Sequence, residues 1–117
     1  MKRIIFAVLT LLPSLVFANT GAVHLDKANY DLNDKASLQR GAATFMNYCF
    51  GCHSTQYQRY NRVAADIGIP EDLMAANLIV NGAKIGDLME NSVPDKDAAK
   101  WFGAPPPDLT LVARVRG

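Results

Sequence analysis

Hydrophobic residues recur with a helical period in the stretch that follows Asp34. They fall at positions i, i+4, i+7, i+8 and i+11, so one helix face would carry Leu38, Ala42, Phe45, Met46 and Cys49. Asp34 is of a residue type that favours the N-cap position of a helix. The pattern therefore predicts a helix over residues 35–48, with an apolar stripe that ends at Cys49.

The middle of the chain contains shorter segments with their own start signals. Residues 54–65 are amphipathic, and the side chains expected on one side are Tyr57, Tyr60 and Ala64. Pro70 and the two acidic residues after it favour the start of a short helix over residues 73–80. Residues 84–91 are expected to form a loop.

Two further helices are expected near the C-terminal end. Pro94 and the charged residues after it introduce a helix over residues 98–102. The prolines at 105–107 must be extended, because each proline restricts the residue before it. Asp108 is then a suitable N-cap for a helix over residues 109–116. The side chains expected to face inward on this helix are Leu109, Val112 and Ala113.

The first eighteen residues have the pattern of a secretory signal peptide. Lys2 and Arg3 form a charged start, residues 4–17 form an apolar core, and Ala18 ends a cleavage site. The polar residues 19–33 show no clear period and are expected to form an extended arm. Residues 34–117 then form one domain, small enough that a bound cofactor would supply much of its apolar core.

The net charge argues against one class of partner, and the hydropathy argues against a membrane-spanning segment. Lys2 and Arg3 account for two of the twelve basic residues, so the remaining chain has ten basic and eleven acidic residues and a net charge of −1. This balance argues against nucleic acid as a partner. No stretch after the signal peptide approaches eighteen consecutive apolar residues, so no transmembrane helix is expected there.

The chain's chemistry is concentrated in Cys49-Phe50-Gly51-Cys52-His53. The pattern Cys-x-x-Cys-His is the attachment signature of c-type haem, in which two thiols bond to the haem vinyl groups and the imidazole ligates the iron. On a helical turn Cys49, Cys52 and His53 lie at i, i+3 and i+4 and project from one face. Export agrees with this interpretation, because c-type haem is attached outside the cytoplasm in bacteria.

The cysteine pair has two other possible interpretations. A thioredoxin-like dithiol normally opens the helix of a strand–helix–strand unit, and no strand-like run precedes Cys49. A zinc site would need a second pair of ligands, and His24 is the only other His in a chain with two cysteines. Haem attachment is therefore the leading hypothesis.

Several short sequence blocks after the motif are typical of one family of c-type cytochromes. The chain resembles the cytochrome c1 family, the haem subunit of the ubiquinol–cytochrome c oxidoreductase (bc1) complex, in its proteobacterial form. The resemblance starts near residue 38 and continues to the last residue, and it rests on Tyr57-Gln58-Arg59-Tyr60, Lys84-Ile85-Gly86-Asp87, Lys100-Trp101-Phe102-Gly103, Pro106-Pro107-Asp108-Leu109-Thr110 and Arg114-Val115-Arg116. It implies an all-α, small c-type cytochrome fold with helices packed around one covalent haem.

The resemblance also implies a function and a set of site residues. Cys49 and Cys52 would be the thioether residues of one haem c, and His53 the proximal iron ligand. Arg116 would face a haem propionate, and the pocket would be lined by Pro106 and Pro107. The implied role is electron transfer from a Rieske iron–sulfur protein to a cytochrome c acceptor, beside cytochrome b at the periplasmic face of the bacterial inner membrane.

The chain departs from the family pattern at its C-terminal end. The family's sixth iron ligand, a Met, and its membrane anchor lie beyond Gly117, so the chain is interpreted as an N-terminal fragment. Met74 and Met89 are expected to be core fillers rather than ligands. We therefore expect high-spin iron that binds carbon monoxide. The alternative function is a haem sensor or peroxidase-like protein with an open sixth position.

Overall fold

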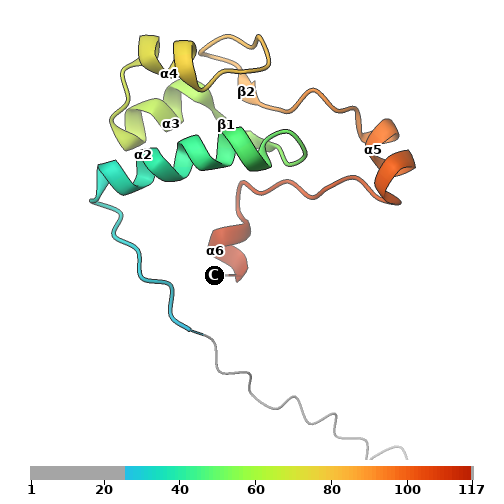
Figure 1. Ribbon diagram of the computed structural model, residues 1–117, viewed down its shortest axis with the longest axis horizontal. Coiled ribbons are helices and arrows are strands. Elements are labelled where there is room, and N and C mark those ends of the chain that lie inside the picture. The colour runs from blue at the N-terminus through green and yellow to red at the C-terminus, as the bar shows by residue number, and fades with distance from the viewer. Residues whose placement is uncertain (1–25, 117) are drawn as a thin grey trace, which may run out of the picture.

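The computed structural model describes residues 26–116, which begin with an exposed segment without helix or strand over residues 26–31 and a turn at residues 32–33 (Figure 1). The expected signal peptide and the first part of the arm lie outside the described residues. Among residues 26–116, no helix is both long enough and apolar enough to cross a membrane.

The predicted first helix forms and continues into the haem motif. Helix α2 (Lys35–Thr44) is followed without a break by a π-helical turn over Phe45–Cys49. The Asp34 carboxylate accepts a hydrogen bond from Ser37 N at 3.0 Å, an N-cap of the kind that contributes ~0.5–2 kcal/mol. The wider π turn is closed by Phe50 N donating to Phe45 O at 2.9 Å.

The core lies where this π turn packs against α3 (Tyr60–Ile67) and α4 (Glu71–Asn77). Phe50 makes edge-to-face contacts with Phe45 and Tyr60, at ring-centroid distances of 6.1 and 6.3 Å. Tyr60 and Met74 are fully buried. The complete buried cluster consists of Met46, Phe50, Tyr60, Ala64, Met74, Leu78 and Met89.

The expectation of an all-α domain is wrong in one respect, because the structure contains a two-stranded antiparallel sheet. Strand β1 (Thr55–Arg59) pairs with β2 (Leu88–Met89), with an irregular register between Thr55↔Met89 and Arg59↔Leu88. The side chains expected to share one side of residues 54–65 therefore lie on different elements. Tyr57 is 72% exposed on β1, whereas Tyr60 begins α3 and is buried. The strand conformation of residues 55–59 is determined by their pairing with residues distant in the sequence.

Pro70 and Pro94 precede two later helices, and Gly68 and Gly103 each end a helix, as the sequence predicts, although the two helices that follow the prolines both begin earlier than expected. Gly68 ends α3 with a φ of 74°, a left-handed conformation that glycine adopts without strain. Helix α4 follows Pro70 and ends at Asn77, one turn earlier than expected. Helix α5 (Asp95–Phe102) follows Pro94 and is succeeded by Gly103, with a φ of 83°.

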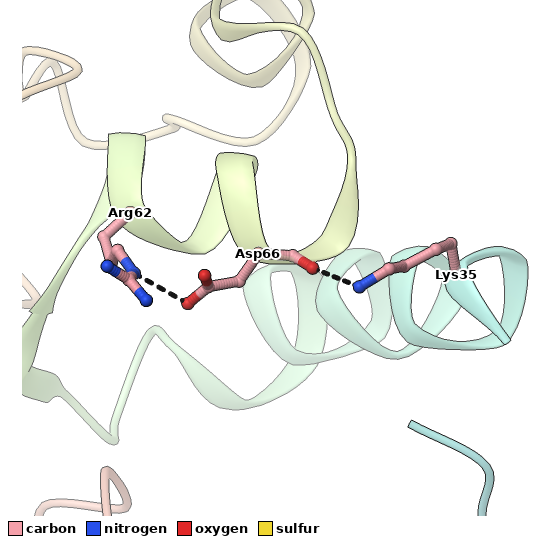
Figure 2. Close-up of polar contacts among 3 residues, drawn as sticks. All are labelled: Lys35, Arg62 and Asp66. Atoms are coloured by element: carbon pink, nitrogen blue, oxygen red, sulfur yellow. Dashed lines mark hydrogen bonds and ion pairs between the residues drawn. The ribbon is translucent and has the colours of Figure 1, made fainter. Parts of the chain in front are cut away.

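Polar contacts at Asp66 connect α2 to α3 (Figure 2). Lys35 Nζ donates to the Asp66 backbone carbonyl. On the same residue, the carboxylate accepts from Arg62 Nε at 3.0 Å. The Arg62–Asp66 pair is exposed and contributes little to stability. The contact from Lys35 spans 31 positions and joins the start of α2 to the end of α3.

The last helix differs from its prediction. Helix α6 covers only Val112–Arg116, and Figure 1 shows it apart from the group formed by α2, α3 and α4. Of the residues expected to face inward, Leu109 is half-buried, while Val112 and Ala113 are exposed. Asp108 does form hydrogen bonds at this turn, with Thr110 N at 3.0 Å.

Candidate haem-binding site

The motif Cys49–His53 occupies one backbone turn at the end of the π-helical segment. Cys52 N and His53 N both donate to Cys49 O, at 3.0 and 2.9 Å. This turn preserves the one-turn spacing on which the haem hypothesis depends. Both cysteines are free thiols, Cys49 half-buried and Cys52 exposed. The two sulfur nucleophiles are therefore accessible and are not consumed by a disulfide.

The His53 ring is oriented by a contact with a residue 54 positions later. Its Nδ1 lies 2.8 Å from the backbone oxygen of Pro107. A carbonyl oxygen can only accept a hydrogen bond, so this contact requires a proton on Nδ1, and in the neutral ring the lone pair is then on Nε2. An imidazole held in this way is suited to ligate a metal, because the hydrogen bond at Nδ1 fixes the orientation of the ring.

Residues 105–110, here called the proline strap, run alongside the motif and the start of β1. Leu109 N donates to Ser54 O at 2.9 Å, and Gln56 N donates to Asp108 Oδ2 at 2.8 Å. A longer contact of 3.4 Å joins Tyr57 N to the Thr110 hydroxyl. These contacts, with the one from Pro107 to His53, hold the strap along residues 53–57. The sequence predicts a helix cap at Asp108 and carries no signal of this pairing.

A polar cleft of about 570 Å³ lies between the strap, residues 90–98 and the end of the motif, and Cys49 and His53 do not line it. Cys52, Pro106 and Pro107 all line it, so the structure brings together these three predicted site residues. Arg116 does not line this cleft. It lines a separate apolar pocket of about 300 Å³ with Tyr57, Leu111 and Val115. All four residues are exposed, and Arg116 forms no part of the motif's immediate surroundings in this structure.

The donor set fits a covalently attached haem. One turn carries two free thiols and an imidazole with an available Nε2. The buried Thr55 hydroxyl, which has no hydrogen-bond partner among the described residues, lines a different pocket with Phe45 and Met46 and is not evidence for this cofactor. Apolar surface is also open beside the strap, where Leu111 is 58% and Val115 75% exposed. A flat apolar macrocycle would cover surface of this kind.

The alternatives for the cysteine pair gain no support from the described residues. Within residues 26–116, no three His, Cys, Asp or Glu side chains gather in a group that could hold a metal ion such as zinc. The first strand of that part of the chain, β1, follows the motif, whereas a dithiol motif of the thioredoxin kind follows a strand.

The methionines of the described residues lie in the core. Met46, Met74 and Met89 all pack there, and Met74 and Met89 are therefore core fillers, as the sequence predicts.

Asp108 has a perturbed carboxyl group. Burial raises its pKa, but hydrogen bonds from the Thr110 side chain and from the backbone N–H groups of Gln56 and Thr110 outweigh burial, and the pKa lies below its ordinary value of 3.8. These bonds favour the charged form. The strap is therefore held by an ionised carboxylate.

This lowered pKa predicts a loss of stability in acid. An Asp with a lower pKa in the folded state stabilises the fold fully above its unfolded pKa of ~4, and loses that contribution as the pH falls through the folded pKa. The free energy of unfolding, measured with urea at a series of pH values, should therefore fall below pH ~4. In Asp108→Ala that part of the fall should be absent. An identical pH dependence in both proteins would contradict the assignment.

Comparisons with known proteins find similarity over most of the chain. The model of the Cytochrome C1 family matches residues 26–117. Cytochrome c1 of Allochromatium vinosum is 56% identical over 117 residues, which cover 99% of this chain and 48% of that protein. The ammonia monooxygenase gamma subunit of Nitrosomonas europaea is 47% identical over 119 residues, covering all of this chain and 50% of that protein.

A plant relative is more distant. The mitochondrial cytochrome c1-2 heme protein of Solanum tuberosum is 28% identical over 99 residues, covering 71% of this chain and 38% of that protein. The chain thus spans about half the length, or less, of the curated relatives it matches. Because the family model covers most of the chain, the chain belongs to the cytochrome c1 family.

Proposed function

We propose that this chain carries one haem c, attached through Cys49 and Cys52 with His53 as the proximal iron ligand, and transfers single electrons. The observation that carries the proposal is the hydrogen bond of 2.8 Å between His53 Nδ1 and Pro107 O. It commits the imidazole to the tautomer that a haem iron requires and orients its free nitrogen before any cofactor is bound.

Each residue of the motif has a distinct task. The two thiols would add across the two vinyl groups of the haem to form thioether bonds, which would make its attachment permanent. His53 would ligate the iron, and Pro106 and Pro107 would line the cleft beside the motif. When bound, the haem supplies reversible one-electron chemistry, at a potential set by its axial ligands and surroundings. The protein's contribution is position, hydrogen bonding and dielectric environment.

Arg116 is proposed to pair with a haem propionate. Its guanidinium is permanently charged and suited to a carboxylate. The exposed position of α6 means that this pairing would draw the helix toward the haem. The membership of the cytochrome c1 family and the apolar pocket that Arg116 borders support the assignment.

The setting of the proposed reaction is a quinol-oxidising bc1 complex at the periplasmic face of a bacterial inner membrane. There the haem would receive electrons from a Rieske iron–sulfur protein, lie beside cytochrome b, and reduce a cytochrome c acceptor. Membrane attachment would come through the complex and a C-terminal anchor, and an N-terminal signal peptide would direct export. The 56% identity to a cytochrome c1 supports this setting over one based on the gamma subunit.

Purification of a tagged copy from its native membranes tests this proposal. We expect cytochrome b and a Rieske protein to copurify, and quinol to reduce the haem c in the preparation. The matched control is the same chain with Cys49 and Cys52 replaced by serine, which should yield no quinol-reducible haem c. Isolation of a haem c that quinol cannot reduce, with neither partner present, would contradict the proposed role.

A further inference from the structure

The prolines of the strap cannot donate the backbone hydrogen bonds that would hold it against the rest of the fold. Residues 105–107 are all proline and have no backbone N–H, so they can accept hydrogen bonds but cannot donate them. The carbonyl of Pro107 nevertheless has to be held at hydrogen-bond distance from His53 Nδ1. The anchors must therefore come from the residues that follow the prolines.

Asp108 supplies one of these anchors, and its carboxylate also closes the turn at the end of the strap. Its Oδ2 accepts from Gln56 N at 2.8 Å, across 52 positions of sequence, and ties the strap to β1. Its Oδ1 accepts from Thr110 N at 3.0 Å and closes the turn that precedes α6. Charge-assisted bonds of this kind are stronger than neutral ones. The remaining backbone anchor is Leu109 N, which donates to Ser54 O at 2.9 Å.

We infer that Asp108 is a positioning residue for the proposed haem site, holding the Pro107 carbonyl on His53 Nδ1 and thereby setting the electron-donating strength of the axial histidine. Asp108 adjoins Pro107 in the chain, and its partner Gln56 is three residues after His53. The hydrogen bond between the Asp108 carboxylate and Gln56 N, here called the clamp, thus holds the chain on both sides of the His53–Pro107 contact. A firm Nδ1 hydrogen bond raises the basicity of the imidazole and favours the oxidised iron. The inference rests on the proposed function.

Asp108→Ala in the full, haem-loaded chain is the direct test. Without the clamp we expect solvent exchange of the Gln56 amide and of the His53 Nδ1–H, measured by NMR, to become several times faster. We also expect the ratio of reduced to oxidised haem at a fixed potential to rise about threefold, which is about 28 mV at 59 mV per tenfold change for one electron. Asp108→Asn keeps one acceptor oxygen and should give an intermediate response.

A matched control separates positioning from general destabilisation. Asp34→Ala removes a carboxylate that caps α2 through Ser37 N, far along the chain from the strap. It should lower the thermal midpoint while leaving the haem potential and the His53 Nδ1–H exchange unchanged. A potential that rises in Asp108→Ala while the His53 Nδ1–H exchange stays constant would indicate an effect of charge alone and overturn the inference.

The failure of this inference is distinguishable from failure of the proposed function. If all variants carry covalent haem and neither exchange nor potential changes at Asp108, only the positioning role is wrong. If the unaltered chain carries no covalent haem, the proposed function is wrong and the inference falls with it.

Discussion

Replacement of both Cys49 and Cys52 with serine is expected to remove all covalently bound haem from the chain. Serine matches cysteine in size, but its hydroxyl does not replace the thiolate nucleophile in the attachment chemistry. The backbone turn of the motif depends on Cys49 O rather than on either sulfur, so the local fold should survive. Haem staining after denaturing electrophoresis measures the result.

Single replacements serve as the controls for this prediction. Cys49→Ser and Cys52→Ser should each retain one thioether and so keep a fraction of the haem through denaturation. If the double variant still carried haem after denaturation, attachment through these residues would be excluded. If both single variants lost haem completely, the two sulfurs would be required together.

Tyr60→Ala is expected to destabilise the fold by ~3–5 kcal/mol, the range for removal of a buried aromatic side chain. Tyr60 is fully buried and contacts the Phe50 ring at a centroid distance of 6.3 Å. Its hydroxyl donates to Asn81 Oδ1 at 3.3 Å. A small domain has only ~5–15 kcal/mol of stability in total, so much of it would be lost. Urea unfolding followed by circular dichroism measures the change.

Tyr57→Ala is the matched control for the core prediction. Tyr57 is the same residue type three positions earlier and is 72% exposed, so its removal should change stability by no more than ~0.5 kcal/mol. Tyr60→Phe should lie between the two variants, because it keeps the ring and loses one hydrogen bond. Equal effects of Tyr57→Ala and Tyr60→Ala would contradict the description of the core.

Local signals in the sequence predicted the first helix and the positions where helices stop. Asp34 caps α2 as expected, and Gly68 and Gly103 both have positive φ values after α3 and α5. These features depend on neighbouring residues alone, since a cap or a left-handed glycine acts within one turn. The haem motif was recognisable for the same reason, because its chemistry resides in five consecutive residues.

Features that depend on distant pairing could not be predicted in this way. Residues 55–59 have no strong strand pattern, and they form β1 because they pair with β2 on one side of the fold. The helical period that placed Tyr57 with Tyr60 failed at this point. The strap's contacts, from Pro107 to His53 and from Asp108 to Gln56, span more than fifty residues. No local rule specifies contacts of that range, and only the family resemblance placed Pro107 near the haem.

The mass of the purified, denatured chain tests the central claim most directly. The account predicts a mass increased by one haem per chain, together with no thiol that reacts with an alkylating reagent, because both cysteines would be thioethers. The chain is to be produced in a host that exports it and attaches c-type haem. A chain of unmodified mass with two reactive thiols, obtained under conditions that load a known c-type cytochrome, would contradict the account.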